Sequence, residues 1–154
     1  MTVPMKERYF EDYQVGEVLT YGDTLVTERE IIEFASRYDP QSFHLDKAAA
    51  ANSIFGGLIA SGWMTGALVM RMTVDHFISP KSSMGSPGVD AVRWLTPVRA
   101  GDRLRVRVTI IEARRSTSKP DRGVIRSKTE ALNQNDEVVM SFTGMGMYSC
   151  RAAI

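Results

Sequence analysis

One stretch of the chain carries no charged side chain. It extends from Ala48 to Met70, in a sequence in which 24% of the residues are charged. A bilayer span takes about 20 apolar residues, so the length alone would allow one. The pair Gly56-Gly57 weakens a helix, however, and the run that follows it, Leu58 to Met70, is too short to span. We therefore expect a long helix, from about Leu58 to Phe77, buried in a globular domain.

Before this stretch the sequence predicts a strand, a helix and a turn. The strand covers Val18 to Val26. Thr27 is a suitable N-cap for the helix, and Glu30 follows three residues later, as in a capping box. Pro40 ends the helix, because the residue before a proline is pushed out of the α region. That residue is Asp39, which we expect where the backbone turns.

The second half of the chain reads as strands. Leu104 to Ile111 alternates between apolar and polar residues at period two, which is typical of a half-buried strand. Short polar connections separate the segments, so neighbouring strands are expected to pair antiparallel. After Pro40 we expect a short helix over 45–51, a break at 52–57, a loop over 79–88 and strands over 89–97, 104–111, 124–132 and 137–148.

These elements predict an α+β architecture. A helix that is apolar on nearly every side needs cover all round, and a strongly curved antiparallel sheet wrapped around it provides that cover. The 154 residues suffice for one hydrophobic core. No repeat, linker or composition change divides them, so we expect a single domain over residues 1–154.

The composition argues against nucleic-acid and membrane partners. Lys and Arg number 19 and Asp and Glu 18, which gives a net charge of +1 and no general attraction to anionic surfaces. The single Cys150 has no internal disulfide partner, which suits a reducing compartment. The first residues, MTVPMKERYFEDY, lack the apolar core of a secretory signal. We expect a cytoplasmic protein.

Two titratable residues stand just before the charge-free stretch. Asp39 and His44 are five positions apart in Asp-Pro-Gln-Ser-Phe-His, and the segment Gly57-Leu-Ile-Ala-Ser-Gly62 follows them. A carboxylate and an imidazole on one loop can hold a single water and divide the proton transfers between them. No Cys, His and carboxylate set has metal-ligand spacing, and no glycine-rich phosphate loop is present. We expect neither a metal nor a cofactor.

These residues resemble the hydratase motif of the MaoC-like, (R)-specific enoyl-CoA hydratases, which reads roughly Asp-x-Asn-Pro-(Ile/Leu)-His and continues with a His-Gly pair at the central helix. The segment from Trp94 to Leu104 resembles the Pro-Val-x-x-Gly-Asp-x-Leu turn of the same proteins. The similarity extends over about Phe10 to Tyr148. The sequence departs from the motif where Gln41 stands for the Asn, where the proline directly follows the aspartate, and where Ser61 replaces the second His.

The resemblance implies the hotdog fold and a hydro-lyase of fatty acid metabolism that hydrates a trans-2-enoyl-CoA or dehydrates a 3-hydroxyacyl-CoA. Asp39 and His44 would be the catalytic pair, with the donor of the proton to C2 left open. The N–H of Gly62 would form the oxyanion hole, and the absence of a side chain there would let the thioester approach closely. The residues expected to contact substrate are Gln41, Gly57, Ser61 and Trp63.

The resemblance also implies partners. The substrate would be a thioester of CoA or of an acyl-carrier protein, with CoA entering only as part of the substrate, and the protein would form a homodimer or a dimer of dimers. Two other functions stay open: an acyl-CoA thioesterase on the same fold, and a non-catalytic subunit that binds acyl thioesters. Thioesterases of this fold generally lack the Asp–His pair, whereas a non-catalytic role predicts that replacing Asp39 and His44 leaves the biological role intact.

Overall fold

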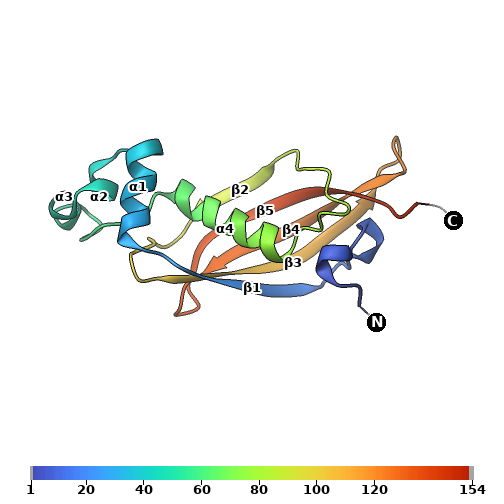
Figure 1. Ribbon diagram of the computed structural model, residues 1–154, viewed down its shortest axis with the longest axis horizontal. Helices are drawn as coiled ribbons and strands as arrows, with labels where there is room; N and C mark the ends of the chain where they lie inside the picture. Colours follow the sequence, from blue (N-terminus) through green and yellow to red (C-terminus); the bar gives the residue numbers. More distant parts are fainter. Residues whose placement is uncertain (1, 153–154) are drawn as a thin grey trace.

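The computed structural model describes residues 2–152. One curved five-stranded sheet, in the order β1-β3-β4-β5-β2, runs along the length of the molecule (Figure 1). Every pairing in it is antiparallel, as the short connections predicted. The strands are β1 (Val18–Leu25), β2 (Val89–Trp94), β3 (Arg103–Arg115), β4 (Arg122–Leu132) and β5 (Val138–Ser149).

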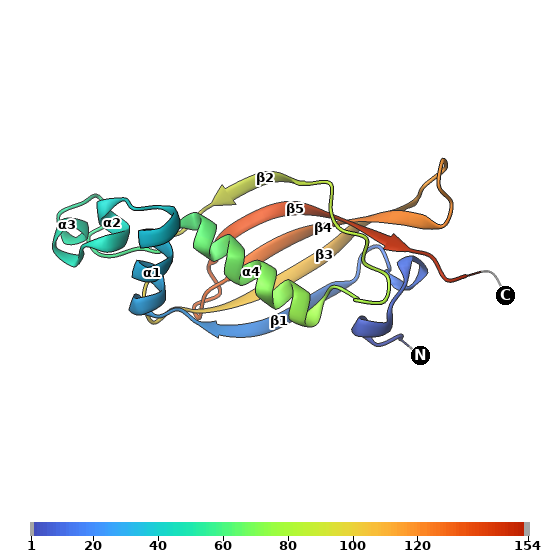
Figure 2. The ribbon, with the colours of Figure 1, turned by 45° about the horizontal axis from the view of Figure 1, so that its top comes forward.

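The helices lie in two places. The longest, α4, crosses the concave face of the sheet, while the three others gather beyond one end of the sheet (Figure 2). A long helix held in a curled antiparallel sheet is the hotdog fold, as expected. The helices are α1 (Glu28–Tyr38), α2 (Ser42–Leu45), α3 (Lys47–Ala51) and α4 (Gly62–His76), and two short 3-10 turns, Met5–Glu7 and Phe10–Asp12, precede β1.

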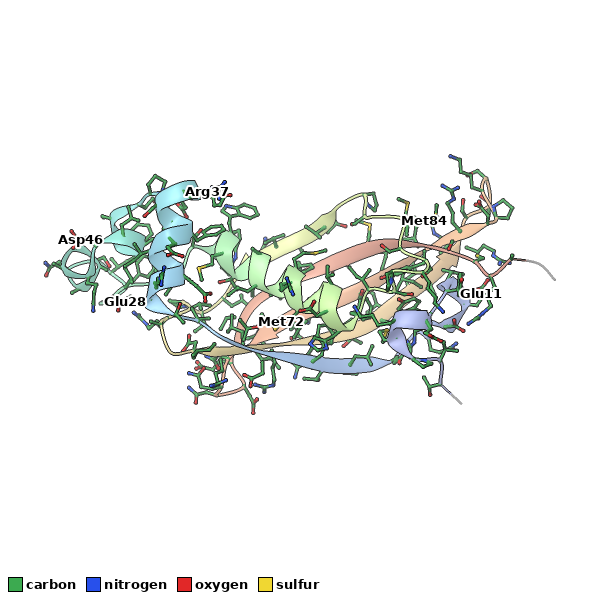
Figure 3. The ribbon with its side chains drawn as sticks, in the orientation of Figure 1. Glu11, Glu28, Arg37, Asp46, Met72 and Met84 are labelled. Carbon is green, nitrogen blue, oxygen red and sulfur yellow. The ribbon has the colours of Figure 1, made fainter. Side chains whose placement is uncertain are left out.

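The core lies between α4 and the sheet. Alternate residues of β3 point into it, and α4 contributes Met64, Val69 and Met72. Met72 also packs against β1 (Figure 3), where a Cβ on Gly22 would overlap its side chain. The buried residues of β3 are Leu104, Val106, Val108 and Ile110.

The sheet covers α4 less completely than the sequence predicted. Trp63, Met70 and Val74 on the outer face of the helix are exposed by 65%, 52% and 44%. The prediction that the sheet would surround α4 on every side is therefore wrong for one chain. A single sheet packs against only one side of a helix. Within residues 2–152, no helix combines the length and the apolar character that a bilayer crossing needs.

The central helix begins later than predicted. It starts at Gly62 rather than near Leu58, because Ser61 acts as its N-cap: the Ser61 hydroxyl accepts the N–H of Trp63 at 3.3 Å. The residue before this cap is tied instead to another loop, since the N–H of Ala60 donates to the carbonyl of Val98 at 2.8 Å. The strand predicted over 89–97 is also shorter in the structure, because β2 ends at Trp94 and does not reach Pro97.

The short helix predicted over 45–51 is confirmed as α3, and a separate turn of helix, α2, precedes it. Asp46 separates them and caps α3, where its carboxylate accepts the N–H groups of Ala48 and Ala49 at 2.9 and 3.0 Å. His44 therefore belongs to the single-turn helix α2. The sequence had suggested a loop at this position. The N-cap of α1 is confirmed, because the Thr27 hydroxyl accepts the N–H of Glu30 at 3.1 Å.

Candidate active site

The segment between α1 and α2 presents a carboxylate and an imidazole to each other. Asp39 is the C-cap of α1, and its N–H still donates to Ala35 at 2.9 Å. Pro40 then turns the chain, and α2 begins two residues later. His44 on α2 is buried, and its Nε2 lies 3.2 Å from Oδ2 of Asp39. The five-residue spacing thus brings the two side chains together across one turn.

A backbone carbonyl fixes the orientation of the imidazole. Nδ1 of His44 lies 2.7 Å from the carbonyl oxygen of Ile59, in the segment that leads to α4. A carbonyl only accepts, so Nδ1 must carry the proton. In the neutral ring the lone pair is therefore on Nε2, the atom that faces Asp39. Nε2 is thus the nitrogen of the neutral ring that can accept a proton.

Neighbouring polar groups keep Asp39 ionised. Nε2 of Gln41 donates to Oδ1 of Asp39 at 2.7 Å. This hydrogen bond, followed by one from the buried Ser61 hydroxyl and by the attraction of His44, lowers the pKa of Asp39 below its ordinary value. The carboxylate is therefore negative at neutral pH, with one oxygen held by Gln41 and the other directed at His44.

A cavity of 420 Å³ opens beside this pair. Asp39 and His44 form one side of it, and the first turn of α4 forms another with Gly62, Trp63 and Thr65. The remaining wall is largely apolar and comes from the segment around the end of β2 and from the loop before α4. Its residues are Phe55, Ile59, Ala60, Trp94, Leu95, Thr96, Pro97 and Val98.

The N-terminus of α4 offers an uncommitted backbone donor to this cavity. Within residues 2–152, no carbonyl or side chain accepts the N–H of Gly62. It is one of the orphan donors at the positive end of the helix. The indole of Trp94 covers the residue: its Nε1 donates to the Gly62 carbonyl at 2.9 Å, and a Cβ would overlap its ring. The packing of Trp94 thus requires a glycine at this position.

The residues expected to contact substrate fall into two groups. Trp63 lines the cavity. The walls do not include Gln41 or Ser61. Gln41 donates to Asp39 and so positions the carboxylate, whereas Ser61 is buried as the N-cap of α4. Gly57 also lies outside the cavity walls. A Cβ on Gly57 would be 3.2 Å from Nη1 of Arg99. Arg99 holds this loop by donating to the carbonyl of Phe55 at 2.5 Å.

Two elements of the site were not foreseen. The segment from Trp94 to Val98 lines the cavity although the sequence analysis used it only as a turn motif, and the Ile59 carbonyl orients His44. A backbone carbonyl has no sequence signal. Among residues 2–152, no cluster of three His, Cys, Asp or Glu side chains is placed to hold a metal ion.

The fold and the site define a class of protein: a hotdog domain with an Asp–His pair beside the N-terminus of its central helix. The sequence matches the family model described as MaoC like domain over residues 13–132, which is well over half of the chain. The chain belongs to the MaoC-like domain family. This confirms the family indicated by the motif.

Relatives of known sequence or structure support the assignment. Protein MaoC of Klebsiella aerogenes is 33% identical over 103 residues, which make up 66% of this chain and 30% of that protein, so the chain spans less than a third of this relative. The MaoC-like dehydratase of Rhodospirillum rubrum is 36% identical, with a TM-score of 0.89 and coverage of 95% and 99% of the two chains. R-hydratase PhaJ1 of Pseudomonas aeruginosa is 26% identical, with a TM-score of 0.72 and coverage of 95% and 92%. The family thus includes both hydratases and dehydratases.

Proposed function

We propose that the chain is a hydro-lyase that reversibly adds water across the C2–C3 double bond of a trans-2-enoyl thioester. One observation carries the proposal: Asp39 and His44 pair at 3.2 Å on the wall of a cavity that also contains Gly62 at the start of α4. Membership of a family with hydratases and dehydratases supports the reaction class. CoA is the proposed thiol of the substrate.

The first step uses the tautomer of His44. A water held by Oδ2 of Asp39 and Nε2 of His44 gives one proton to Nε2 while its oxygen bonds to C3. The ring becomes an imidazolium, with Nδ1 still bonded to the Ile59 carbonyl and the new N–H directed at the carboxylate. Asp39 stabilises this positive charge, and its lowered pKa keeps it ionised throughout.

The second step returns the proton. As C3 accepts the water oxygen, the π electrons move toward C2 and onto the thioester oxygen. The Gly62 N–H stabilises that charge, as an oxyanion-hole donor whose removal costs about 2.7–4 kcal/mol in comparable enzymes. C2 then takes the proton from Nε2 of His44, which restores the neutral ring. One water is consumed, no electrons are exchanged with another reagent, and dehydration is the same sequence in reverse.

The proposed assembly is a homodimer. β2 is an edge strand of the sheet, and an edge presents backbone donors and acceptors to a second chain. Large apolar side chains are exposed along this edge and on the neighbouring outer face of the helix, namely Val89, Trp94, Met70 and Val74. A second copy related by a twofold axis would cover both features with one self-complementary surface.

The direct test is an assay of the purified chain with crotonyl-CoA. Hydration removes the conjugated double bond, so the ultraviolet absorbance of the enoyl thioester should fall while no free thiol appears. Thiol release would instead indicate a thioesterase. If the chain binds crotonyl-CoA and changes neither signal, the hydro-lyase proposal is wrong and a binding subunit is the better description.

A further inference from the structure

A second apolar cavity continues the crevice between α4 and β2. Its volume is 540 Å³, compared with 420 Å³ for the proposed catalytic cavity. On the helix it is lined by Gly66, Ala67 and Met70, and on the strand by Val89 and Val92. We call this second cavity the apolar groove. Its size and lining would suit the tail of a long acyl chain.

The two cavities lie end to end. The first residues of α4 and the last residue of β2 line the catalytic cavity. Later residues of α4 and earlier residues of β2 line the groove. The end of β2 lies beside the first turn of α4 (Figure 2). Among residues 2–152, Trp63 is the one residue on the walls of both cavities. A chain that extends from the catalytic pair along the crevice therefore meets Trp63 before it reaches the groove.

Trp63 contacts Trp94 where the two cavities meet. The two rings meet edge to face, with centroids 5.1 Å apart and planes at 76°, so their contact crosses from the helix to the strand. Trp94 is held in place, because its Nε1 donates to the Gly62 carbonyl and its ring packs onto Gly62. Trp63 is 65% exposed and depends on this aromatic contact. Of the two rings, that of Trp94 is hydrogen-bonded to the helix, and a single substitution at Trp63 removes the other.

We propose that Trp63 is a specificity-determining residue that separates the catalytic cavity from the apolar groove and restricts the protein to thioesters of short acyl chains. This inference rests on the proposed function, since it concerns the substrate of the same site. The wild-type site accommodates a chain that ends before the tryptophan pair. Without the Trp63 ring, a longer chain continues into the groove.

The test compares kcat/KM for crotonyl-CoA and trans-2-decenoyl-CoA. Wild-type protein should favour crotonyl-CoA. In Trp63→Ala the ratio of decenoyl to crotonyl kcat/KM should rise by about tenfold or more, because each methylene buried in an apolar cavity strengthens binding by about fourfold. Adding Ala67→Phe to this variant refills the groove and should return the ratio toward the wild-type value.

Met70→Ala is the matched control. Met70 lines the groove and not the catalytic cavity, so its truncation enlarges the groove while the tryptophan pair stays closed, and the ratio should remain that of the wild type. The inference is overturned if wild-type protein favours decenoyl-CoA, or if Trp63→Ala hydrates crotonyl-CoA with an unchanged ratio. Absence of hydration by the wild type with either substrate would refute the proposed function itself, a result distinguishable from failure of the barrier alone.

Discussion

Two glycines of α4 should respond in opposite ways to the same substitution. Gly62 lies under the indole of Trp94, and a Cβ there would overlap the ring. Gly66 lies one turn further along, where a Cβ would meet Cε of Met140 at 3.5 Å, an ordinary contact distance. Gly62→Ala should therefore displace Trp94 and lower both stability and activity, and Gly66→Ala should raise stability.

The magnitudes follow from these contacts. Overpacking at Gly62 costs about 1–3 kcal/mol, and loss of the Trp94–Gly62 hydrogen bond costs about 1 kcal/mol. Since Trp94 is 44% exposed and its ring can yield toward solvent, we expect a total near the lower end. About 2 kcal/mol corresponds to a fall in Tm of about 4–8 °C. Alanine is better than glycine inside a helix by about 1 kcal/mol, so Gly66→Ala should raise Tm by about 2–4 °C.

Thermal unfolding followed by circular dichroism measures both changes, and the crotonyl-CoA assay measures the loss of activity. Gly62→Ala shifts the first peptide of α4, which carries the proposed oxyanion donor, so its hydration rate should fall more than that of Gly66→Ala. If Gly62→Ala has the wild-type Tm and full activity, Trp94 does not pack on this glycine as the structure shows. The account of the helix N-terminus would then be wrong.

Two further predictions concern the carboxylate and the assembly. Gln41→Leu removes the hydrogen bond that contributes most to lowering the pKa of Asp39, so that pKa should rise. The carboxyl carbon resonance of Asp39, followed by NMR against pH, reports this pKa directly, and an unchanged value in Gln41→Leu would contradict the positioning role of Gln41. Sedimentation at micromolar concentration should give the mass of two chains, and Val89→Lys on β2 should shift the protein toward one chain; a monomeric wild type would refute the dimer.

The sequence predicted the fold from patterns that act locally. Alternation over Leu104 to Ile111 predicted a strand because one face of β3 is buried against α4. The cap at Thr27 and the break at Pro40 set the limits of α1 because both act on adjacent backbone groups. The start of α4 was misplaced because Ala60 is tied to Val98, a distant segment whose position no local pattern reveals.

The site could be predicted only in part for the same reason. The spacing of Asp39 and His44 indicated a pair, and the structure places them in contact. The roles of Gln41 and Ser61 depended on where their side chains point: Gln41 donates to Asp39, and Ser61 caps α4. Trp94 reaches Gly62 from a strand far along the chain, so its contribution followed from tertiary packing alone.

The central claim is that Asp39 and His44 together perform the proton transfers of hydration. General acid–base groups contribute about 10²–10⁴-fold, so Asp39→Asn and His44→Ala should each lower kcat/KM for crotonyl-CoA by at least about 10²-fold. Asp46→Asn is the matched control, since Asp46 caps α3 outside the cavity and asparagine caps equally well. The account predicts near-complete loss of hydration in the first two variants, with folded circular dichroism spectra, and wild-type activity in the third. Wild-type turnover by folded Asp39→Asn and His44→Ala would contradict it.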